Sequence, residues 1–518
     1  MRHLLIGLFA LAAAGGCGKS LQLNLVVNDP CNQRVLGDTT LGISHIELSI
    51  AAPDLVAPEG TTWSRAEGQG EAPGITPVAN ATVTVEGRAA NGAGAPADVL
   101  AAIGVGYVDL TGKDTDVVDL QVVFGRIDRF MNTTDAAAAS DGTVRCTALS
   151  AERRGHTASL LPDGRVFIAG GEAVKPSATT FWETTEYFEP TTGLFERGPN
   201  MKWVRKAHTA TVLNDGRVLL TGGVGLNGTS VDTWKVALIY NPTTGAFDNP
   251  IPMKAQRANH TATLLDDGRV LVAGGTQGTH DLDTTEIFDP TSGAFCDGPQ
   301  LKPPSGAAQP RAFHSAVRVG RSQVALIGGQ GAGQLLSSVH FVEVVGCGGS
   351  VAAGQSLSKA RSNAVAALIP GKDAVVVAGG FDAVVTAIEN GKGIDSVEVI
   401  KLSPQNLGQS TVDCSTLRLL SARGAAAAAE VPGGLLVAGG LGATGLGQNT
   451  AETIRYGDIG TCELAFTATA GGLGVPRAGS QATLMVGGDV LLSGGFNTDG
   501  GSTVTQPQAQ GEIYVRRR

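Results

Sequence analysis

The residue pair Gly-Gly recurs at nearly constant intervals, and it limits what this chain can fold into. Seven apolar runs end in the doublet, whose first glycines are Gly170, Gly222, Gly274, Gly328, Gly379, Gly439 and Gly494. The intervals are 52, 52, 54, 51, 60 and 55 residues. A repeat of this length that holds several short strands is typical of a propeller blade. The sequence therefore predicts a seven-bladed β-propeller over residues 143–518.

One copy of the repeat, residues 257–301, divides into four strands. HTATLL alternates apolar and polar residues, DDG is a tight turn with Gly268 at the positive φ, and RVLVAGG is the antiparallel partner. TTEIFDP and AFCDGPQL, joined by the turn TSG, supply the third and fourth strands. We expect the doublet where a strand passes so close to its neighbours near the central axis that Cβ atoms do not fit.

The pattern R-x-x-H-T-A, D-G-R, G-G, T-x-E-x-F-x-P-x-[ST]-G-x-F resembles bacterial kelch and galactose-oxidase-like propeller repeats. The first three copies keep the pattern. The later four keep the doublet, while the first turn becomes VGRSQ, PGKDA, VPGG and VGGD. The resemblance implies an all-β fold and covers residues 143–518, so the ring is expected from both the resemblance and the spacing.

The two ends of the repeat region predict how the ring closes. The last copy stops after GEIYV, residues 511–515, which matches a third strand, so its fourth strand is missing. Residues 143–150 align with the fourth-strand end of other copies, and we expect them to complete blade seven. Closing the ring with both chain ends removes exposed strand edges. The polar, alanine-rich residues 131–142 are predicted to be a linker.

Residues 17–130 are predicted to form a separate β-sandwich domain of immunoglobulin-like type. Short alternating runs occur at residues 21–27, 43–50, 81–87 and 117–124. Period-two alternation between Gly, Pro and Asn residues indicates half-buried strands, and several such strands are typical of a sandwich.

Residues 1–16 have the layout of a secretory signal peptide, because Arg2 precedes an apolar run that ends in small residues. The sequence AAAGGCGKS resembles the bacterial lipobox, which would make Cys17 the lipidated residue. Ala14 stands where that motif usually has leucine, so cleavage by an ordinary signal peptidase is the alternative. Gly18 favours an outer-membrane lipoprotein, facing the periplasm or the surface. We expect a protein tethered to the membrane through a lipid anchor.

Export would place the remaining cysteines in a compartment that permits disulfides. They are Cys31, Cys146, Cys296, Cys347, Cys414 and Cys462. Six cysteines allow fifteen connectivities, and the sequence does not choose among them. Their spacing does not indicate a zinc site.

An arginine occurs in all seven copies, three residues before the histidine position. These arginines are Arg153, Arg205, Arg257, Arg311, Arg361, Arg423 and Arg477. Third strands carry Glu186, Glu286, Glu343, Glu398, Glu452 and Glu512, with Leu238 in blade two. Because a buried arginine needs a carboxylate partner, we expect structural Arg-Glu pairs. The alternative is a ring of guanidinium groups that binds anions at the channel mouth, but the glutamates would neutralise it.

A catalytic site is not found in the sequence. Galactose-oxidase-like relatives hold copper with two histidines and two tyrosines, one of which is cross-linked to a cysteine, and no such set can be assembled here. The sequence also has no G-x-S-x-G, H-E-x-x-H or P-loop motif. We therefore expect no cofactor and no metal, although an envelope enzyme of carbohydrate or oxidase type remains the alternative function.

The loops between the doublet and the third strand vary in length, whereas the turns on the opposite face are nearly constant. Variable loops over a rigid ring are typical of a binding surface. Candidate residues of this ligand face are Phe181, Trp182, Trp203, Trp234, Asp281, Phe381 and Asp382. The sequence thus predicts a monomeric binding or scaffold protein of the cell envelope, with an unknown protein or glycan as partner. The net charge of −9 is spread along the chain and no basic stripe occurs, so nucleic acid is not expected.

Overall fold

The computed structural model describes the strands between residues 4 and 132 and most of the chain beyond residue 147. The described ranges are 4–10, 22–28, 43–51, 59–64, 69–70, 81–89, 99–108, 117–126, 129–132, 148–175, 178–304, 306–498, 506–509 and 511–515. The predicted lipidation residue Cys17 lies outside them, as do Cys31 and Cys146.

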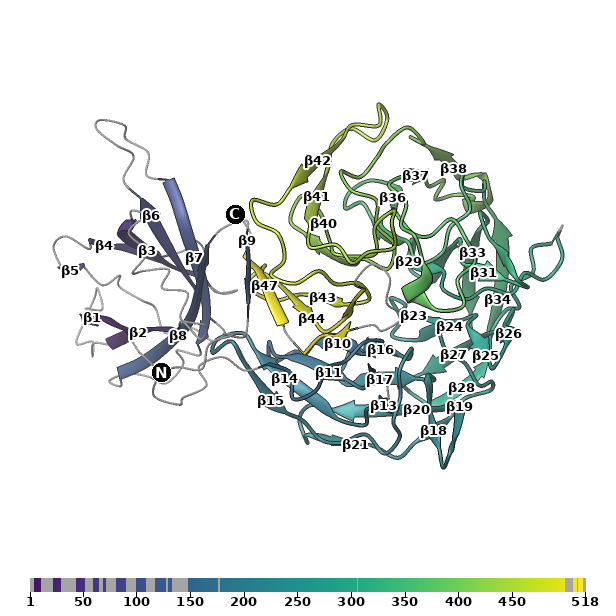
Figure 1. Cartoon of the computed structure of the whole chain (residues 1–518), viewed down its shortest axis with the longest axis horizontal. Coiled ribbons are helices and arrows are strands. Elements are labelled where there is room, and N and C mark those ends of the chain that lie inside the picture. The colour runs from purple at the N-terminus through teal and green to yellow at the C-terminus, as the bar shows by residue number, and fades with distance from the viewer. Residues whose placement is uncertain are drawn as a thin grey trace.

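Seven four-stranded antiparallel sheets surround a central axis and form the propeller (Figure 1). Blade one consists of β10 (Thr157–Leu160), β11 (Val166–Ala169), β14 (Thr185–Glu189) and β15 (Leu194–Arg197). Blade two consists of β16 (Thr209–Val212), β17 (Val218–Thr221), β20 (Val236–Asn241) and a fourth strand split into β21 (Ala246–Phe247) and β22 (Ile251–Pro252). Blade three consists of β23 (Thr261–Leu264), β24 (Val270–Ala273), β27 (Thr285–Asp289) and β28 (Ala294–Asp297).

The remaining blades have the same strand order. Blade four consists of β29 (Ser315–Arg318), β30 (Gln323–Ile327), β33 (Val339–Val345) and β34 (Gly348–Ala353). Blade five consists of β35 (Val365–Leu368), β36 (Ala374–Ala378), β37 (Val397–Lys401) and β38 (Thr411–Asp413). Blade six consists of β39 (Ala427–Val431), β40 (Gly434–Ala438), β41 (Ala451–Tyr456) and β42 (Leu464–Ala468). Blade seven consists of β43 (Gln481–Leu484), β44 (Val490–Ser493), β47 (Gly511–Val515) and β9 (Arg129–Asn132).

The loops after the doublet add small elements on one face of the ring. Five of them form two-stranded hairpins: β12 (Glu172–Lys175) with β13 (Ala178–Phe181), β18 (Val224–Asn227) with β19 (Ser230–Thr233), β25 (Thr276–Gln277) with β26 (His280–Asp281), β31 (Gln330–Gly331) with β32 (Gln334–Leu335), and β45 (Phe496–Asn497) with β46 (Gln506–Pro507). In blade five the loop instead contains the 3-10 turn η1 (Ile388–Asn390). A second such turn, η2 (Leu407–Gln409), precedes β38.

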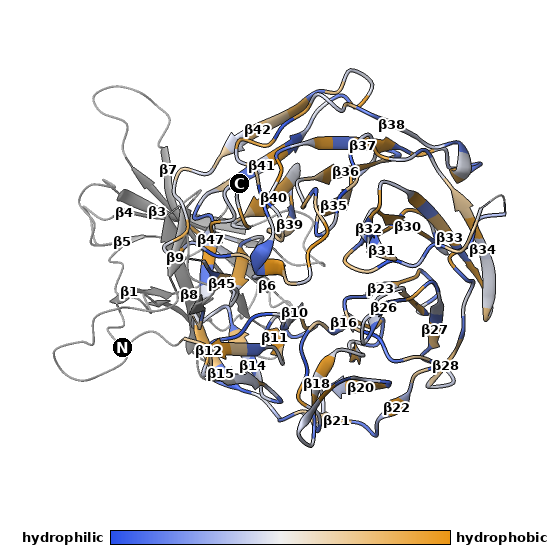
Figure 2. Cartoon of the chain, turned by 45° about the vertical axis from the view of Figure 1, so that its right-hand side comes forward, coloured by the Kyte–Doolittle hydropathy of each residue, from blue (hydrophilic) through white to orange (hydrophobic). Residues whose placement is uncertain are grey.

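Hydrophobic side chains fill every interface between neighbouring blades. In β11, Val166 and Ile168 pack toward blade seven, whereas Phe167 and Ala169 pack toward blade two. Successive residues of a strand point to opposite faces, so a second strand buried on both faces must be apolar throughout. This explains the continuous runs before each doublet, and Figure 2 shows apolar residues along the blade strands.

The glycine doublet connects each blade to the next. The N–H of Gly171 donates to the carbonyl of Arg205 in blade two over 2.8 Å, and the corresponding bond closes the ring from Gly495 to the carbonyl of Arg153 over 2.9 Å. Gly170 has a φ of +66°, and a Cβ atom there would lie 2.5 Å from the same Arg205 carbonyl. A side chain at the doublet would thus break the contact between blades.

The repeat arginines are buried, and five form ion pairs with glutamates of their own third strands. The pairs are Arg153–Glu186 at 2.5 Å, Arg257–Glu286 at 2.7 Å, Arg361–Glu398 at 2.6 Å, Arg423–Glu452 at 2.8 Å and Arg477–Glu512 at 2.5 Å. Each of the seven arginines also donates from NH1 to the carbonyl of its blade's first doublet glycine, over 2.6–3.3 Å. The arginine therefore ties three strands of its blade together.

Blade four differs from the prediction that Glu343 pairs with Arg311. Arg311 NH2 donates to Nδ1 of His340 over 3.0 Å, and Glu343 is exposed with only a 3.5 Å contact from the Ser350 hydroxyl. The strand register gives the reason, because His340 pairs with Leu326 as Glu286 pairs with Val272 in blade three. Glu343 lies three residues further along the strand and hence on the opposite face.

The repeat histidines connect neighbouring blades through hydrogen bonds. His260 Nε2 lies 2.8 Å from the hydroxyl of Thr221 in blade two, and His314 Nε2 lies 2.9 Å from the hydroxyl of Thr261 in blade three. Burial lowers the pKa of His314 to about 3, so the ring is neutral at physiological pH. These contacts account for the histidines as structural residues.

Blade seven is closed by an N-terminal strand, but by residues other than 143–150. β9 pairs antiparallel with β47, with Asn132 opposite Glu512 and Arg129 opposite Val515 (Figure 1). Closure from the chain start therefore occurs, and the strand that provides it lies within the segment predicted to end the N-terminal domain and begin the linker.

The repeat itself explains why residues 148–150 do not supply this strand. Leu149 is buried four residues before Arg153, as Met201 is buried four residues before Arg205. Met201 lies in the loop that follows the fourth strand of blade one. Residues 148–153 therefore occupy the loop position of the repeat.

The strands of residues 4–126 form one eight-stranded sheet, so the predicted immunoglobulin-like sandwich is not confirmed. The sheet order is β1-β2-β8-β7-β6-β3-β4-β5. Its strands are β1 (Leu4–Ala10), β2 (Gln22–Asn28), β3 (Ile43–Ala51), β4 (Glu59–Ser64), β5 (Gln69–Gly70), β6 (Ala81–Ala89), β7 (Val99–Val108) and β8 (Val117–Arg126). β1 lies within the predicted signal peptide, so removal of that peptide would leave β2 at the edge of the sheet.

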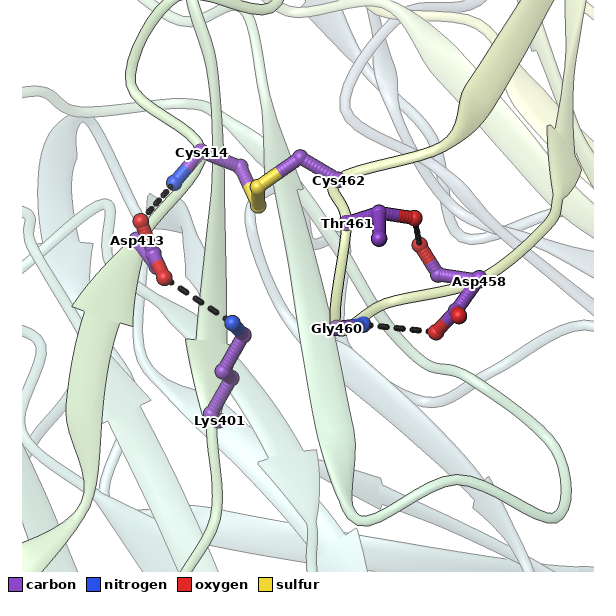
Figure 3. The surroundings of a disulfide bond; sticks show 7 residues. All are labelled: Lys401, Asp413, Cys414, Asp458, Gly460, Thr461 and Cys462. Carbon is purple, nitrogen blue, oxygen red and sulfur yellow. Dashed lines mark hydrogen bonds and ion pairs between the residues drawn. A yellow bond between two sulfur atoms is a disulfide. The ribbon is translucent and has the colours of Figure 1, made fainter.

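Two disulfides join neighbouring blades and resolve part of the cysteine pairing that the sequence left open. Cys296 of blade three bonds Cys347 of blade four, and Cys414 of blade five bonds Cys462 of blade six. Figure 3 shows the second bond, beside which Asp413 accepts hydrogen bonds from the Cys414 N–H and from Lys401. Both bonds lie at the outer, fourth-strand side of the blades.

Candidate functional site

The segments that precede the first strands form a rigid collar around the central channel. One residue per blade has a positive φ there: Gly155, Ala207, Asn259, Phe313, Asn363, Ala425 and Gly479, with φ between 50° and 64°. Backbone N–H groups of successive collar residues donate to the carbonyl of the preceding blade's residue, from Ala207 to Gly155 onward, over 2.9–3.1 Å. Left-handed backbone is costly for residues other than glycine, so these bonds must hold the collar in shape.

A cavity of about 450 Å³ opens at this collar, on the face that carries the variable loops. Its wall combines collar residues with residues that directly follow a doublet, such as Glu172 and Phe496. Side-chain amides of Asn259, Asn363 and Gln481 add neutral donors and acceptors. A cavity of this size at the axis of a ring can enclose a small polar molecule.

Four charged side chains form a connected network at one side of the cavity. Arg154 Nε lies 2.9 Å from Oε1 of Glu172, and Lys206 Nζ lies 2.7 Å from the same oxygen. Arg154 NH1 also lies 3.2 Å from Oε2 of Glu389. The guanidinium of Arg154 rests 5.2 Å from the ring centre of Phe496. Two cations and two carboxylates leave the network without net charge. It therefore offers a ligand both hydrogen-bond donors and hydrogen-bond acceptors, and not a surface of one charge.

The loop of blade five reaches across the mouth of the channel to blade one. Thr386, Ala387, Ile388 and Glu389, which include the start of η1, line the cavity. The Glu389–Arg154 ion pair joins this loop to the opposite part of the ring, and η1 lies near its centre in Figure 1. At 12% and 25% exposure the two side chains are still reached by solvent, so the pair can be displaced by a ligand.

The donor set at the cavity does not fit a copper ion of the kind that galactose-oxidase-like proteins hold. Its lining includes no histidine, cysteine or tyrosine. Within the described part of the chain, the group of side chains that could hold a metal is Asp413, Cys414 and Cys462. The two cysteines form a disulfide, so they do not supply thiolates.

The residues predicted for the ligand face lie elsewhere on the propeller, and none of the seven lines the cavity. Phe381 is fully buried in a cluster with Leu441 and Phe496, so its prediction as a loop contact is wrong. It follows a doublet directly, and residues there pair with the collar segment; Phe381 pairs with Ser362. Asp382 is exposed and pairs with Lys359 at 2.9 Å.

The three predicted tryptophans make contacts within the propeller. Trp182 and Trp234 donate from Nε1 to the carbonyls of Glu152 and Val204, each over 2.9 Å. Trp203 packs on the core between blades one and two. These contacts give the three indoles structural roles.

Two further predicted residues also have partners on the loops. Phe181 lies 5.6 Å from the ammonium of Lys206, measured to its ring centre. Asp281 accepts the backbone N–H of Ala332 over 3.0 Å, and burial raises the pKa of its carboxyl.

Sequence reasoning missed the charged network, although a signal for it was present. The residue after the repeat arginine is Arg154 in blade one and Lys206 in blade two, but small in the other five copies. The residue after the doublet is Glu172 in blade one and uncharged in the other six. The blade fold does not require charged residues at these positions, because the other copies do without them. Charged residues that depart from the repeat pattern are therefore candidates for a functional site.

No protein-family model matches the chain. An F-box/kelch-repeat protein of Arabidopsis thaliana is 27% identical over 165 residues, which are 29% of this chain and 34% of that protein. The match thus spans about a third of that relative's length. No helix of the described residues is long and apolar enough to cross a membrane.

Among solved structures, a fungal alcohol oxidase of the AA5 family, in complex with copper, superposes with a TM-score of 0.55 at 17% identity, covering 71% of this chain and 75% of that chain. The structure of YjhT has a TM-score of 0.44 at 15% identity and covers 62% of this chain and 99% of that chain. The repeat match and the seven blades support a kelch-like propeller, and the first of these structures shares its fold.

Proposed function

We propose that this kelch-like propeller is an envelope binding protein that takes a neutral glycan into the cavity at its channel mouth. The observation that carries the proposal is the charge-balanced network of Arg154, Glu172, Lys206 and Glu389 beside three side-chain amides and the rings of Phe313 and Phe496. Sugar hydroxyls both donate and accept hydrogen bonds, so they match a wall that holds both kinds of partner. Aromatic rings suit the apolar faces of sugars.

Blade five supports a ligand that enters from solution. Its loop forms part of the cavity wall and is tied to blade one by the partly exposed Glu389–Arg154 pair. A ligand that supplied hydroxyls to Arg154 would replace that contact without leaving a buried charge unpaired.

The binding test uses Thr386, an exposed residue of the cavity wall. Thr386→Trp would fill the cavity without disturbing the core, and Thr386→Ser is the matched control. On a panel of neutral, acidic and basic glycans, we expect the wild-type protein and Thr386→Ser to bind the same neutral glycans. Thr386→Trp should lose at least tenfold in affinity, which is about 1.4 kcal/mol. Equal binding by all three proteins would place the ligand outside the cavity. If the protein bound peptides but no glycan of the panel, the glycan proposal would be wrong.

We also propose that the protein is exported and anchored in the outer membrane through lipid on Cys17. The two disulfides support an oxidising compartment, because such bonds persist outside the reducing cytosol. Cys17→Ser should move the protein from the membrane fraction to the soluble fraction of the envelope. Continued membrane association of Cys17→Ser would contradict the lipid anchor.

A further inference from the structure

The arginine of blade two is buried without the counter-charge that five other blades provide. Arg205 is fully buried, and its NH1 donates to the carbonyls of Gly222 at 2.9 Å and Val236 at 3.4 Å. Its Nε and NH2 have no hydrogen-bond partner. In the described part of the chain, it is the one repeat arginine with an unpartnered terminal nitrogen.

Blade three shows what occupies this position elsewhere. Oε1 of Glu286 accepts from Nε of Arg257 at 3.1 Å and from NH2 at 2.7 Å, while Oε2 accepts the backbone N–H of Lys254 at 2.7 Å. The same second contact, over 2.6–2.7 Å, occurs at Ser150, Ser358, Leu420 and Gly474. A carboxylate therefore bridges the guanidinium and a backbone amide of the preceding loop.

Blade four shows that the repeat can lose its glutamate and still give both terminal nitrogens of the arginine hydrogen-bond partners. NH2 of Arg311 has three acceptors within reach, namely Nδ1 of His340 at 3.0 Å, Oε1 of Gln309 at 2.9 Å and the hydroxyl of Ser338 at 3.0 Å. Three neutral acceptors thus replace one carboxylate.

Blade two makes neither arrangement. Leu238 stands at the glutamate position and Val236 at the position of Thr284, whose hydroxyl accepts from Arg257 in blade three. Leucine has no atoms beyond Cδ, so the places of the two glutamate oxygens are not occupied by this side chain. Lys202, which follows the buried Met201 as Lys254 follows Met253, has no carboxylate to receive its N–H.

We propose that blade two binds a small monovalent anion, which is chloride in a cell, between the guanidinium of Arg205 and the backbone amide of Lys202. A buried charge without a partner is strongly unfavourable, and an anion at this point would restore the bridge that glutamate forms in the other blades. One guanidinium beside the apolar Leu238 and Val236 suits a singly charged, weakly hydrated ion better than sulfate or phosphate.

The charge of Arg205 persists in the folded protein. Burial lowers its pKa to about 9, which still leaves the guanidinium charged at neutral pH. The anion site is independent of the glycan proposal, because Arg205 does not line the channel cavity.

Bromide provides a direct test, because it replaces chloride and scatters anomalously. Crystals of the wild-type protein grown or soaked in sodium bromide should show an anomalous peak within hydrogen-bond distance of Arg205 NH2. No peak should occur beside Arg257, where Glu286 already occupies the position. Absence of a peak at Arg205, or a water molecule there in its place, would overturn the proposal.

Thermal unfolding in chloride and in gluconate at equal ionic strength gives a second test. The wild-type Tm should rise by about 2 °C for each tenfold increase in chloride. Leu238→Glu supplies a carboxylate as the other blades do, so its Tm should be high in both salts and independent of chloride. Leu238→Met fills a similar volume without a carboxylate or amide oxygen and should have a low Tm in both. A wild-type Tm that is equal in chloride and gluconate would contradict the site.

Discussion

Single residues of the repeat hold buried charge in place, and the pair of Arg257 and Glu286 shows this most clearly. Both side chains are at most 1% exposed, and Glu286 also accepts two backbone N–H groups of the preceding loop. Glu286→Ala should lower the free energy of unfolding by about 3–5 kcal/mol, because it leaves a buried guanidinium without its counter-charge.

Glu343 is the matched control for that substitution. It lies on a third strand as well, but it is exposed, so Glu343→Ala should change the free energy of unfolding by less than about 0.5 kcal/mol. Chemical denaturation of both variants measures the difference. Equal losses would show that the strand register places Glu343, and not His340, at the arginine.

Five buried histidines predict how stability depends on pH. Burial lowers the pKa values of His156, His314 and His340 to about 3 and those of His208 and His260 far below 6.5. Protons therefore bind the unfolded chain first, so stability is fully present above pH 6.5 and falls as the pH drops. Each histidine should contribute a slope of about 1.4 kcal/mol per pH unit below that point. Burial raises the pKa of Glu512, which offsets part of the loss.

Denaturant unfolding between about pH 7 and pH 5 measures this slope. His314→Gln should reduce this slope by the contribution of one histidine. A stability that is flat over this range, or that rises on acidification, would contradict neutral buried histidines.

At the scale of elements, close contact between blades explains why a glycine doublet must follow each second strand. Gly274 and Gly278 have nearly the same φ, +60° and +58°, but a Cβ atom at Gly274 would strike the Arg311 carbonyl while nothing lies within 4 Å at Gly278. Gly278→Ala should cost about 1–2 kcal/mol for its backbone conformation alone. Gly274→Ala should cost about 3 kcal/mol or more, because the contact between blades three and four is also lost.

Thermal unfolding of the two glycine variants separates conformation from contact. If Gly274→Ala and Gly278→Ala lowered the Tm equally, close approach between blades would not be the reason for the doublet.

The elements also show where sequence reasoning succeeds and where it fails. Strand pairs within a blade are local, so the turn at Gly268 and the doublets predicted them from adjacent residues. His340 was missed because the start of β33 depends on the length of its loop, which no local pattern fixes. The charged network was missed because Arg154 and Glu389 are 235 residues apart.

At the scale of the whole molecule, the ring depends on one long-range strand pair. β9 and β47 join residues near 130 to residues near 513, and the sequence predicted that such closure occurs but not which strand provides it. The repeat pattern does not extend to Arg129–Asn132, since the alanine-rich residues 133–147 separate this strand from Leu149.

Two deletions test this closure. Removal of residues 129–132 should expose the edge of β47, lower the Tm and promote association of chains through the open blade. Removal of residues 136–139, which are four alanines, should leave the Tm nearly unchanged. Light scattering and thermal unfolding read both effects, and equal behaviour of the two variants would argue against β9 as the closing strand.

We propose that the ring holds a cavity of about 450 Å³ for a neutral glycan, where blade one meets the loop of blade five. A crystal structure of the protein with a neutral glycan that it binds tests this claim most directly. We predict sugar density within the cavity, with hydroxyls on Arg154 and Glu389 in place of their mutual ion pair. Density only on the outer loops, with the Arg154–Glu389 pair intact, would contradict it.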